Sequence, residues 1–164
     1  MPRLQPHPLL RGAAAHGQRG ALSATAPDDL HIYIDGASRG NPGEAGFGVH
    51  VTSPSGEDVA DLYGYLGRAS NNVAEYQALL HALRYALARG ARRLKIFSDS
   101  ELVVRQMAGR YRVKHPDMID LHRRARELLG RFERVDIAHV RREQNKDADR
   151  LANRALDEKS SRLE

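Results

Sequence analysis

The stretch HIYIDGASRGNPG, residues 31–43, begins with the pattern of a strand and ends with that of a turn. Apolar side chains alternate with others from His31 to Asp35, which is the period of a β-strand with one buried face. Asn41-Pro42-Gly43 joins three residues that favour turns. The pattern therefore predicts a strand that ends at Asp35 and leaves this carboxylate at the end of an apolar run.

Three more acidic residues occupy comparable positions in separate parts of the chain. Asp99 follows the short apolar run 94–98, which predicts a buried central strand. Glu75 and Asp149 lie in the first turns of segments that have the spacing of amphipathic helices. Such distant carboxylates can meet only in the folded protein, where their mutual repulsion favours a shared cation. Hard oxygen ligands favour Mg²⁺ or Mn²⁺.

The other patterns predict a mixed α/β domain. Strands over 46–52 and 59–67 flank the turn Ser53-Pro-Ser-Gly56, which predicts an antiparallel hairpin. A helix opens at Asn71 or Asn72 and ends before Gly90, a residue suited to a left-handed stop. After the strand over 94–98, the expected order is a helix that follows Asp99, a helix over about 117–131, a strand over 135–140 and a final helix.

Composition fits one compact domain, since 164 residues with 41% hydrophobic content can bury a substantial core. The absence of cysteine excludes disulfides and thiolate metal sites and fits a reducing compartment, so we expect a cytoplasmic protein. No apolar run approaches the roughly 20 residues that span a bilayer, so we expect no membrane association. The formal net charge of +5 favours polyanionic partners.

The chain divides into three parts. Residues 1–28 are rich in Ala, Gly, Pro and Arg and lack periodicity, so we expect a disordered N-terminal tail. A targeting peptide is the alternative for this segment. We assign residues 29–158 to the domain and residues 159–164 to a short C-terminal tail.

Four segments, in this order, carry a resemblance to type 1 ribonuclease H. They are Asp35-Gly36 with Arg39-Gly40-Asn41-Pro42-Gly43, then Asn71-Asn72-Val73-Ala74-Glu75, Ser98-Asp99-Ser100, and Asn145 to Ala152. The resemblance covers about residues 29 to 158 and implies a ribonuclease H-like fold. That fold is a mixed five-stranded sheet, three antiparallel strands followed by parallel strands, flanked by helices.

The chain is similar to the archaeal-like branch of that family. Only residues 110–116 fill the gap in which other members carry a basic helical protrusion. Arg142 stands in a short loop where better-known members have a histidine. The motif spacing in the last segment favours Asp149 over Asp147 as the final metal ligand, and we expect Asp147 to be a surface acid.

The resemblance implies an endoribonuclease that hydrolyses the RNA strand of RNA/DNA hybrids and leaves 5′-phosphate and 3′-hydroxyl ends. Asp35, Glu75, Asp99 and Asp149 would hold two Mg²⁺ ions with substrate, and Mn²⁺ would be a substitute. Arg142, always charged, would assist by binding phosphate or releasing product. Contacts to the minor groove, where the 2′-hydroxyl marks RNA, would come from Gly36, Arg39, Gly40, Asn41, Gly43, Asn71 and Asn72.

Alternatives remain for the residues and for the function. Taken singly, Asp35 fits a turn residue at a strand end, and Glu75 fits an acid that interacts favourably with the helix dipole. Asp99 fits an N-cap, and Asp149 fits a solvated charge on a helix. Asn71 and Asn72 also fit a helix cap. A catalytically silent hybrid-binding module of the same fold is one alternative function, and a nuclease that also cuts double-stranded RNA is another. We expect the chain to be a monomer.

Overall fold

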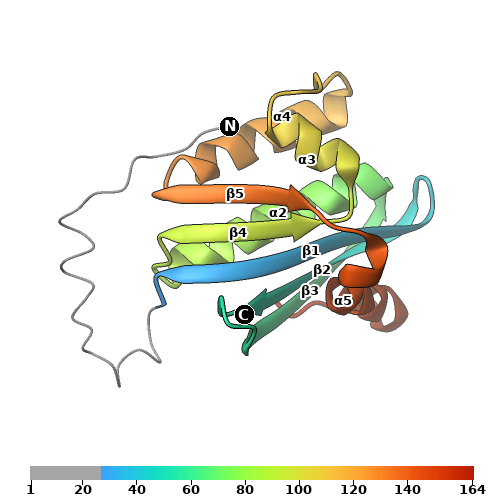
Figure 1. The fold of residues 1–164 in the computed structure, drawn as a ribbon. Helices are drawn as coiled ribbons and strands as arrows, with labels where there is room; N and C mark the ends of the chain where they lie inside the picture. The colour runs from blue at the N-terminus through green and yellow to red at the C-terminus, as the bar shows by residue number, and fades with distance from the viewer. Residues whose placement is uncertain (1–26) are drawn as a thin grey trace.

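A mixed five-stranded sheet forms the centre of the computed structural model, which describes residues 27–164 (Figure 1). The strands lie in the order β3-β2-β1-β4-β5. Strands β1 (Asp29–Gly40), β2 (Gly43–Thr52) and β3 (Asp58–Ala69) are antiparallel, while β4 (Arg93–Ser98) and β5 (Arg134–His139) run parallel to β1. This arrangement confirms the predicted fold class. The predicted tail over residues 1–28 lies, except for its end, outside the described residues.

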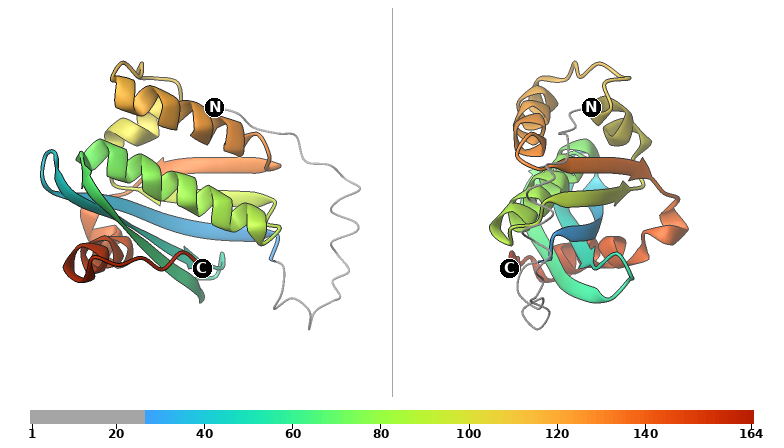
Figure 2. Two further views of the ribbon diagram at one scale, coloured as in Figure 1. Left: turned by 180° about the vertical axis from the view of Figure 1, so that it is seen from behind. Right: turned by 60° about the vertical axis from the view of Figure 1, so that its left-hand side comes forward.

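Helices cover both faces of the sheet (Figures 1 and 2). Helix α2 (Asn71–Ala88) packs on β1 and β2 on one face, where α4 (Pro116–Leu129) and α3 (Glu101–Met107) lie beside it. Helix α5 (Lys146–Glu158) packs on β1, β2 and β3 from the other face. Because side chains alternate along β1, Ile32 and Ile34 face α2 while Asp35 faces α5. The core between the sheet and α2 is therefore apolar, and the α5 face carries polar residues.

Local sequence signals set the ends of α2. The Ser70 side chain accepts a hydrogen bond from the Val73 amide at 3.2 Å and caps the helix. Gly90, with φ of +77°, follows the helix end in the left-handed region, as its sequence position predicts. Tyr76, Leu79 and Leu83 are fully buried and form the apolar face of the helix.

Strand β1 is longer than the sequence pattern predicted, because it continues past Asp35 to Gly40. Its parallel pairing with β4 ends at Ile34 and Ser98, whereas its antiparallel pairing with β2 continues to the turn. The prediction of a strand end at Asp35 is thus wrong for the β1–β2 hairpin and right for the β1–β4 pair. Asp35 lies where β1 loses one neighbour, so its surroundings open at that point.

The last residues of the chain contact the outer strand. The amide of Tyr63 donates to the carbonyl of Arg162 at 2.9 Å, and the amide of Arg162 donates back at 2.8 Å. The Tyr65 amide also donates to the Ser161 hydroxyl at 3.0 Å. Residues 159–164 therefore satisfy part of the exposed edge of β3, which would otherwise offer unpaired backbone groups.

No helix among residues 27–164 is long and apolar enough to cross a membrane.

Backbone-to-backbone packing joins α5 to β2 at Gly48. A methyl group added at Gly48 would lie 2.2 Å from the carbonyl oxygen of Ala148 and 2.7 Å from the amide nitrogen of Ala152. Both contacts are with helix backbone, which cannot move aside as a flexible side chain would. The absence of a side chain at Gly48 thus lets α5 approach the sheet closely.

Gly48→Ala should therefore lower the free energy of unfolding by about 1–3 kcal/mol, the usual cost of overpacking. Urea denaturation monitored by circular dichroism would measure the change. Gly130→Ala is the matched control, because its new methyl group would meet only ordinary contacts from 3.5 Å upward. Equal stability of the two variants would contradict close packing of α5 on β2.

Candidate active site

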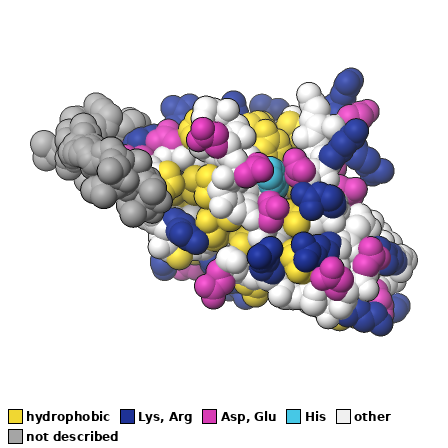
Figure 3. Space-filling view, turned by 90° about the horizontal axis from the view of Figure 1, so that it is seen from below, with side chains coloured by type: hydrophobic (Ala, Val, Ile, Leu, Met, Phe, Trp, Pro, Cys, Tyr) yellow, Lys and Arg dark blue, Asp and Glu magenta, His cyan; other side chains and the backbone are white. Residues whose placement is uncertain are grey.

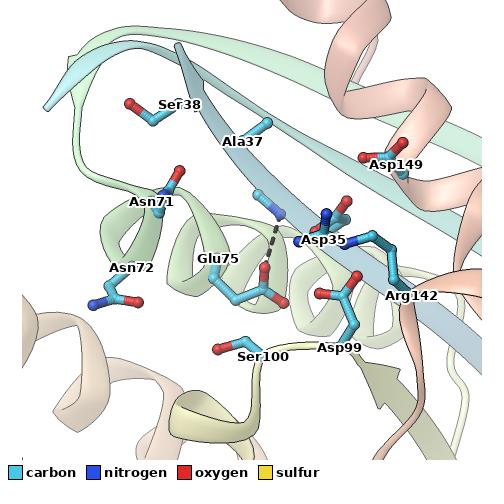
Figure 4. Close-up of a pocket in the computed structure, with 11 residues that line it drawn as sticks. Asp35, Ala37, Ser38, Asn71, Asn72, Glu75, Asp99, Ser100, Arg142 and Asp149 are labelled. Carbon is cyan, nitrogen blue, oxygen red and sulfur yellow. Dashed lines mark hydrogen bonds between the residues drawn. The ribbon is translucent and has the colours of Figure 1, made fainter. Parts of the chain in front are cut away.

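The four predicted carboxylates come from four elements and line one cavity of about 340 Å³ (Figure 4). Asp35 lies in β1, Glu75 in the first turns of α2, Asp99 directly after β4, and Asp149 in the first turn of α5. Their positions follow from the sheet, since β1 and β4 are neighbours whose parallel pairing stops just before Asp35 and Asp99. Two strands and two helices on opposite faces thus converge at one end of the sheet.

Three of these carboxylates form a close group. Asp35, Glu75 and Asp99 each offer an oxygen, and the three oxygens lie within 4.8 Å of one another. Asp149, on the α5 side of the cavity, is not within that distance of all three, but its side chain interacts directly with that of Asp35, and its Oδ1 is 3.4 Å from the Asn153 side-chain amide. The site therefore has a compact part and a more open part.

Glu75 is held rigidly at the centre of the site. Its Oε1 accepts a hydrogen bond from the Gly36 amide at 2.8 Å, and its Oε2 accepts one from the Ser98 hydroxyl at 2.6 Å. A methyl group at Gly36 would lie only 2.3 Å from the Glu75 amide nitrogen, so the backbones of β1 and α2 are in direct contact there. Both carboxylate oxygens are thus oriented by strand residues.

The electrostatics of the site favour a bound cation. Burial and the neighbouring carboxylates of Glu75, Asp99 and Asp149 raise the pKa of Asp35 from its ordinary 3.8 to about 9. Burial raises the pKa of Glu75 from 4.5 to about 8, despite the opposing hydrogen bond from Ser98. In the absence of a counterion, these buried acids are therefore protonated at neutral pH. A divalent cation would stabilise their ionised forms, and an all-oxygen donor set suits a hard ion such as Mg²⁺.

Arg142 also reaches the cavity. It lies in the short 3-10 helix η2 (Arg142–Gln144), between β5 and α5, and lines the cavity with the carboxylates. Figure 4 shows its side chain pointing inward, toward Asp35. This places a permanent positive charge at the mouth of an acidic site.

The predicted substrate-contact residues divide into two sets. Gly36, Asn71 and Asn72 line the cavity with the carboxylates. Arg39, Gly40, Asn41 and Gly43 do not line it and lie at the tip of the β1–β2 hairpin. The tip is nevertheless tied to the site, because the Asn41 side chain accepts a hydrogen bond from the Asn71 amide at 3.1 Å. Arg39 pairs with Asp157 of α5 at 2.8 Å.

The observed helix caps decide whether Asp99 and Asn71 serve as capping residues, the alternative role that the sequence left open for each. Ser100, and not Asp99, caps α3, since its hydroxyl accepts from the Val103 amide at 3.2 Å. Ser70, and not Asn71, caps α2. Neither Asp99 nor Asn71 is therefore used as a cap, and their side chains are available to the cavity.

Sequence reasoning missed several contributors. Ala37, Ser38 and Ser100 line the cavity, and Ser98 orients Glu75. All four lie within quoted motifs, so their place beside the acidic residues was the available signal. The sequence could not show which of these small residues would face inward.

Comparison with known proteins places the chain in a family. A family model described as reverse transcriptase-like matches residues 33–155. The chain is 46% identical to ribonuclease HI of Halobacterium salinarum over 79% of this chain and 65% of that protein. It is 34% identical to ribonuclease H of Methylococcus capsulatus, over 84% of this chain and 94% of that protein.

Solved structures agree with these matches. The crystal structure of RNase H1 from Halobacterium salinarum has a TM-score of 0.77 at 45% identity and covers 79% of this chain and 98% of its own. LC11-RNase H1 in complex with an RNA/DNA hybrid has a TM-score of 0.76 at 37% identity, with coverage of 79% and 98%. Fold and carboxylate cluster thus define a ribonuclease H-like domain.

The chain belongs to the type 1 ribonuclease H family. Residues 108–115 connect α3 directly to α4, which bears out the expected absence of a helical protrusion at this point. Membership of this family implies that the site formed by the carboxylates works with divalent metal ions. The chain spans between 35% and 65% of the length of the first curated relatives that it matches.

The raised pKa values predict a pH-dependent stability in the metal-free protein. The stabilisation from a protonated, buried Asp35 is complete below its ordinary pKa of 3.8 and is lost as pH rises through about 9. Asp35→Asn should therefore become more stable than wild type as pH increases, by about 1 kcal/mol or more at pH 8. Urea denaturation in EDTA between pH 4 and pH 9 would measure this difference.

The matched control is Asp120→Asn, which changes an acid with an exposed side chain on α4. It should not gain stability in this manner. Addition of Mg²⁺ should stabilise wild type more than Asp35→Asn at pH 8. A constant difference between Asp35→Asn and wild type across the pH range would contradict a protonated, buried Asp35.

Proposed function

We propose that this chain is a metal-dependent endoribonuclease that hydrolyses the RNA strand of RNA/DNA hybrids and leaves 5′-phosphate and 3′-hydroxyl ends. The proposal rests above all on the three carboxylate oxygens within 4.8 Å of one another inside an open cavity. The similarity to LC11-RNase H1, a structure in complex with an RNA/DNA hybrid, supports the choice of substrate. A silent binding module would have no physical need for four convergent carboxylates.

Mg²⁺ is the proposed metal, with Mn²⁺ as a substitute, because the donor set consists of carboxylate oxygens. Asp35, Glu75 and Asp99 would hold one ion, and Asp149 would join Asp35 and Asp99 around a second ion when substrate phosphate is present. Ions bound there would supply activation of the attacking water and stabilisation of the leaving 3′ oxygen.

The protein's own residues have separate proposed tasks. Glu75 is fixed by Gly36 and Ser98, so its oxygens keep one orientation while substrate enters. The Gly36 amide is already occupied by Glu75, so Gly36 contributes space for close packing and not a hydrogen bond to substrate. Asn71 and Asn72 carry amides suited to the 2′-hydroxyl in the minor groove of the hybrid.

Arg142 is the proposed auxiliary residue. Its guanidinium is charged at every working pH, so it cannot act as a general base but can bind phosphate in bidentate fashion. Its position opposite Glu75, on the α5 side, suits contact with the phosphate being cut or with the released end (Figure 4).

Two further parts of the proposal concern substrate range and cell context. A-form geometry and 2′-hydroxyls occur in hybrids and in double-stranded RNA, so cleavage of RNA duplex is the second candidate activity. We also propose that the chain works as a monomer. A cytoplasmic location is proposed because the lack of cysteine fits a reducing compartment.

Asp99→Asn should reduce cleavage of a hybrid with a labelled RNA strand by roughly a hundredfold or more, because it removes one of the convergent charged oxygens. The assay compares Mg²⁺ with Mn²⁺ and includes RNA duplex and DNA duplex as substrates. Asp136→Asn, a change on β5 away from the cavity, is the control and should keep wild-type activity. Undiminished cleavage by Asp99→Asn would refute the assignment of the cluster.

Arg142→Ala should lower kcat/KM for the hybrid by about tenfold, the cost of one charge-assisted contact to phosphate. Arg142→Lys should recover only part of this loss, since lysine lacks the planar fork. Arg141→Ala is a close control, because Arg141 is the chain neighbour of Arg142 and does not line the cavity. Equal effects at both positions would show general attraction to the polyanion and not a specific role for Arg142.

A further inference from the structure

Arg39, near the tip of the β1–β2 hairpin, interacts with α5 and does not line the carboxylate cavity. Its Nη2 donates to Asp157 Oδ1 at 2.8 Å and to Asn153 Oδ1 at 3.2 Å. Figure 3, seen from below, shows basic and acidic side chains intermingled over the part of the surface that includes α5. Arg39 thus has two partners on α5 before any substrate is bound.

Asn153 lies on α5 one turn after Asp149, between that carboxylate and Arg39. Its side-chain amide nitrogen donates to the Asp149 carbonyl oxygen at 3.0 Å and lies 3.4 Å from Asp149 Oδ1. A guanidinium has only donors, so the amide oxygen of Asn153 faces Arg39 and its NH₂ group faces Asp149. The contact with Arg39 therefore fixes the orientation of the Asn153 amide.

The carboxylate of Asp149 has few partners. It is half-buried and contacts the carboxylate of Asp35. Among residues 27–164, Asn153 is the only other residue whose side chain hydrogen-bonds to it. Because the Asn153 amide is neutral, it orients Asp149 without pairing its charge, although the positive charge of Arg39 lies just behind the amide. The charge of Asp149 therefore stays available to a cation.

The tip of the hairpin is tied to both helices that carry carboxylates of the site. At the start of α2, the Asn71 amide donates to the Asn41 side chain at 3.1 Å, and on the other face of the sheet Arg39 binds α5. Glu75 belongs to α2 and Asp149 to α5. The hairpin tip therefore joins the two helices beside the site, and its link to α5 passes through the residue that contacts Asp149.

We propose that Asn153 is a positioning residue for Asp149 and that Arg39 acts on the site through Asn153. The inference rests on the proposed function, in which Asp149 takes part in holding the second ion. Neither Asn153 nor Arg39 lines the cavity, so each acts through another residue. Carboxylates that bind metal are themselves hydrogen-bonded, and loss of such a partner typically lowers metal affinity or activity by roughly 10- to 100-fold.

The Mg²⁺ dependence of hybrid cleavage by the full chain tests this proposal. Asn153→Ala should raise the Mg²⁺ concentration for half-maximal activity by about tenfold or more, because Asp149 loses its oriented position. KM for the hybrid should change by less than about twofold, since Asn153 does not contact substrate. Asn153→Gln should restore part of the loss, because glutamine can still donate to an aspartate one turn away. Alanine is a strong helix former, so Asn153→Ala should fold.

Side-chain amide NMR of the metal-free protein gives a readout that does not depend on activity. The signal of Asn153 is identified by its absence from the spectrum of Asn153→Ala. It should shift in Arg39→Ala, which removes the donor to the amide oxygen, and in Asp149→Ala, which removes the carboxylate beside the NH₂ group. An unchanged Asn153 signal in both variants would overturn the proposed chain of contacts.

A double-mutant cycle tests whether Arg39 acts through Asn153. Arg39→Ala should also raise the Mg²⁺ requirement, and its combination with Asn153→Ala should be no worse than Asn153→Ala alone. Glu44→Gln is the matched control, because Glu44 lies opposite Arg39 on β2 and pairs with Lys159, just after α5, at 3.4 Å. This variant removes a hairpin contact near α5 that does not involve Asp149, so it should keep the wild-type Mg²⁺ dependence.

Three kinetic results would also overturn the proposal. One is a wild-type Mg²⁺ dependence in Asn153→Ala. Another is an Arg39→Ala effect that is confined to KM and adds to that of Asn153→Ala, which would show direct contact of Arg39 with substrate. The third is an equal effect of Glu44→Gln, which would show a purely structural tie. Each variant is compared with wild type, so a wild type that cleaves no hybrid would refute the proposed function instead, while the NMR signals would still report the contacts of Asn153.

Discussion

The hydrogen bond from the Gly36 amide to Glu75 joins the central strand to α2 at the end of the sheet where the four carboxylates meet. It requires backbone contact, because a methyl group at Gly36 would lie 2.3 Å from the Glu75 amide nitrogen. The contact occurs where β1 has lost its parallel neighbour and keeps only β2. The same opening admits Asp99 beside Asp35 and leaves room for Asp149 from the other face. The position of the site thus follows from the point at which β1 loses its parallel partner β4 and stays paired with β2 alone.

This arrangement buries ionisable groups where folding alone does not favour their charged forms. Burial and mutual repulsion raise the pKa of Asp35 to about 9, so the metal-free fold holds protonated acids at its site. Groups that must be ionised for function but are protonated in the empty site link stability to metal binding. A site of this kind costs stability, and the apolar layer between the sheet and α2 offsets that cost.

Much of the fold could be predicted from local patterns. The alternation of β1 and the apolar face of α2 are strong signals, since each repeats with the period of its structure. The length of β1 could not be predicted, because the chain carries no local mark of where a parallel partner stops. The resemblance predicted all four carboxylates, and the structure shows that Asp35, Glu75 and Asp99 form a close group that Asp149 joins through Asp35 alone.

The remaining features depend on tertiary contacts without a sequence motif. Ser98 lies beside Asp99, but only the folded chain shows that its hydroxyl orients Glu75. His50 of β2 contacts Asp58 and Asp61 of β3 and Asp147 of α5, residues that have no common spacing. Asp147 was expected to be a surface acid and its side chain is 59% exposed, yet one of its oxygens faces His50. Exposure and side-chain contacts are separate properties, and the sequence pattern bears mainly on the first.

The most direct test of the account is to identify the ends of the RNA fragments that the wild-type protein releases from an RNA/DNA hybrid in Mg²⁺. Metal-assisted attack of water through the carboxylate cavity predicts fragments with 5′-phosphate and 3′-hydroxyl ends, and no fragments in EDTA. Fragments with 5′-hydroxyl and cyclic phosphate ends, or cleavage that persists in EDTA, would show attack by the RNA's own 2′-hydroxyl. That result would contradict the central role assigned to Asp35, Glu75, Asp99 and Asp149.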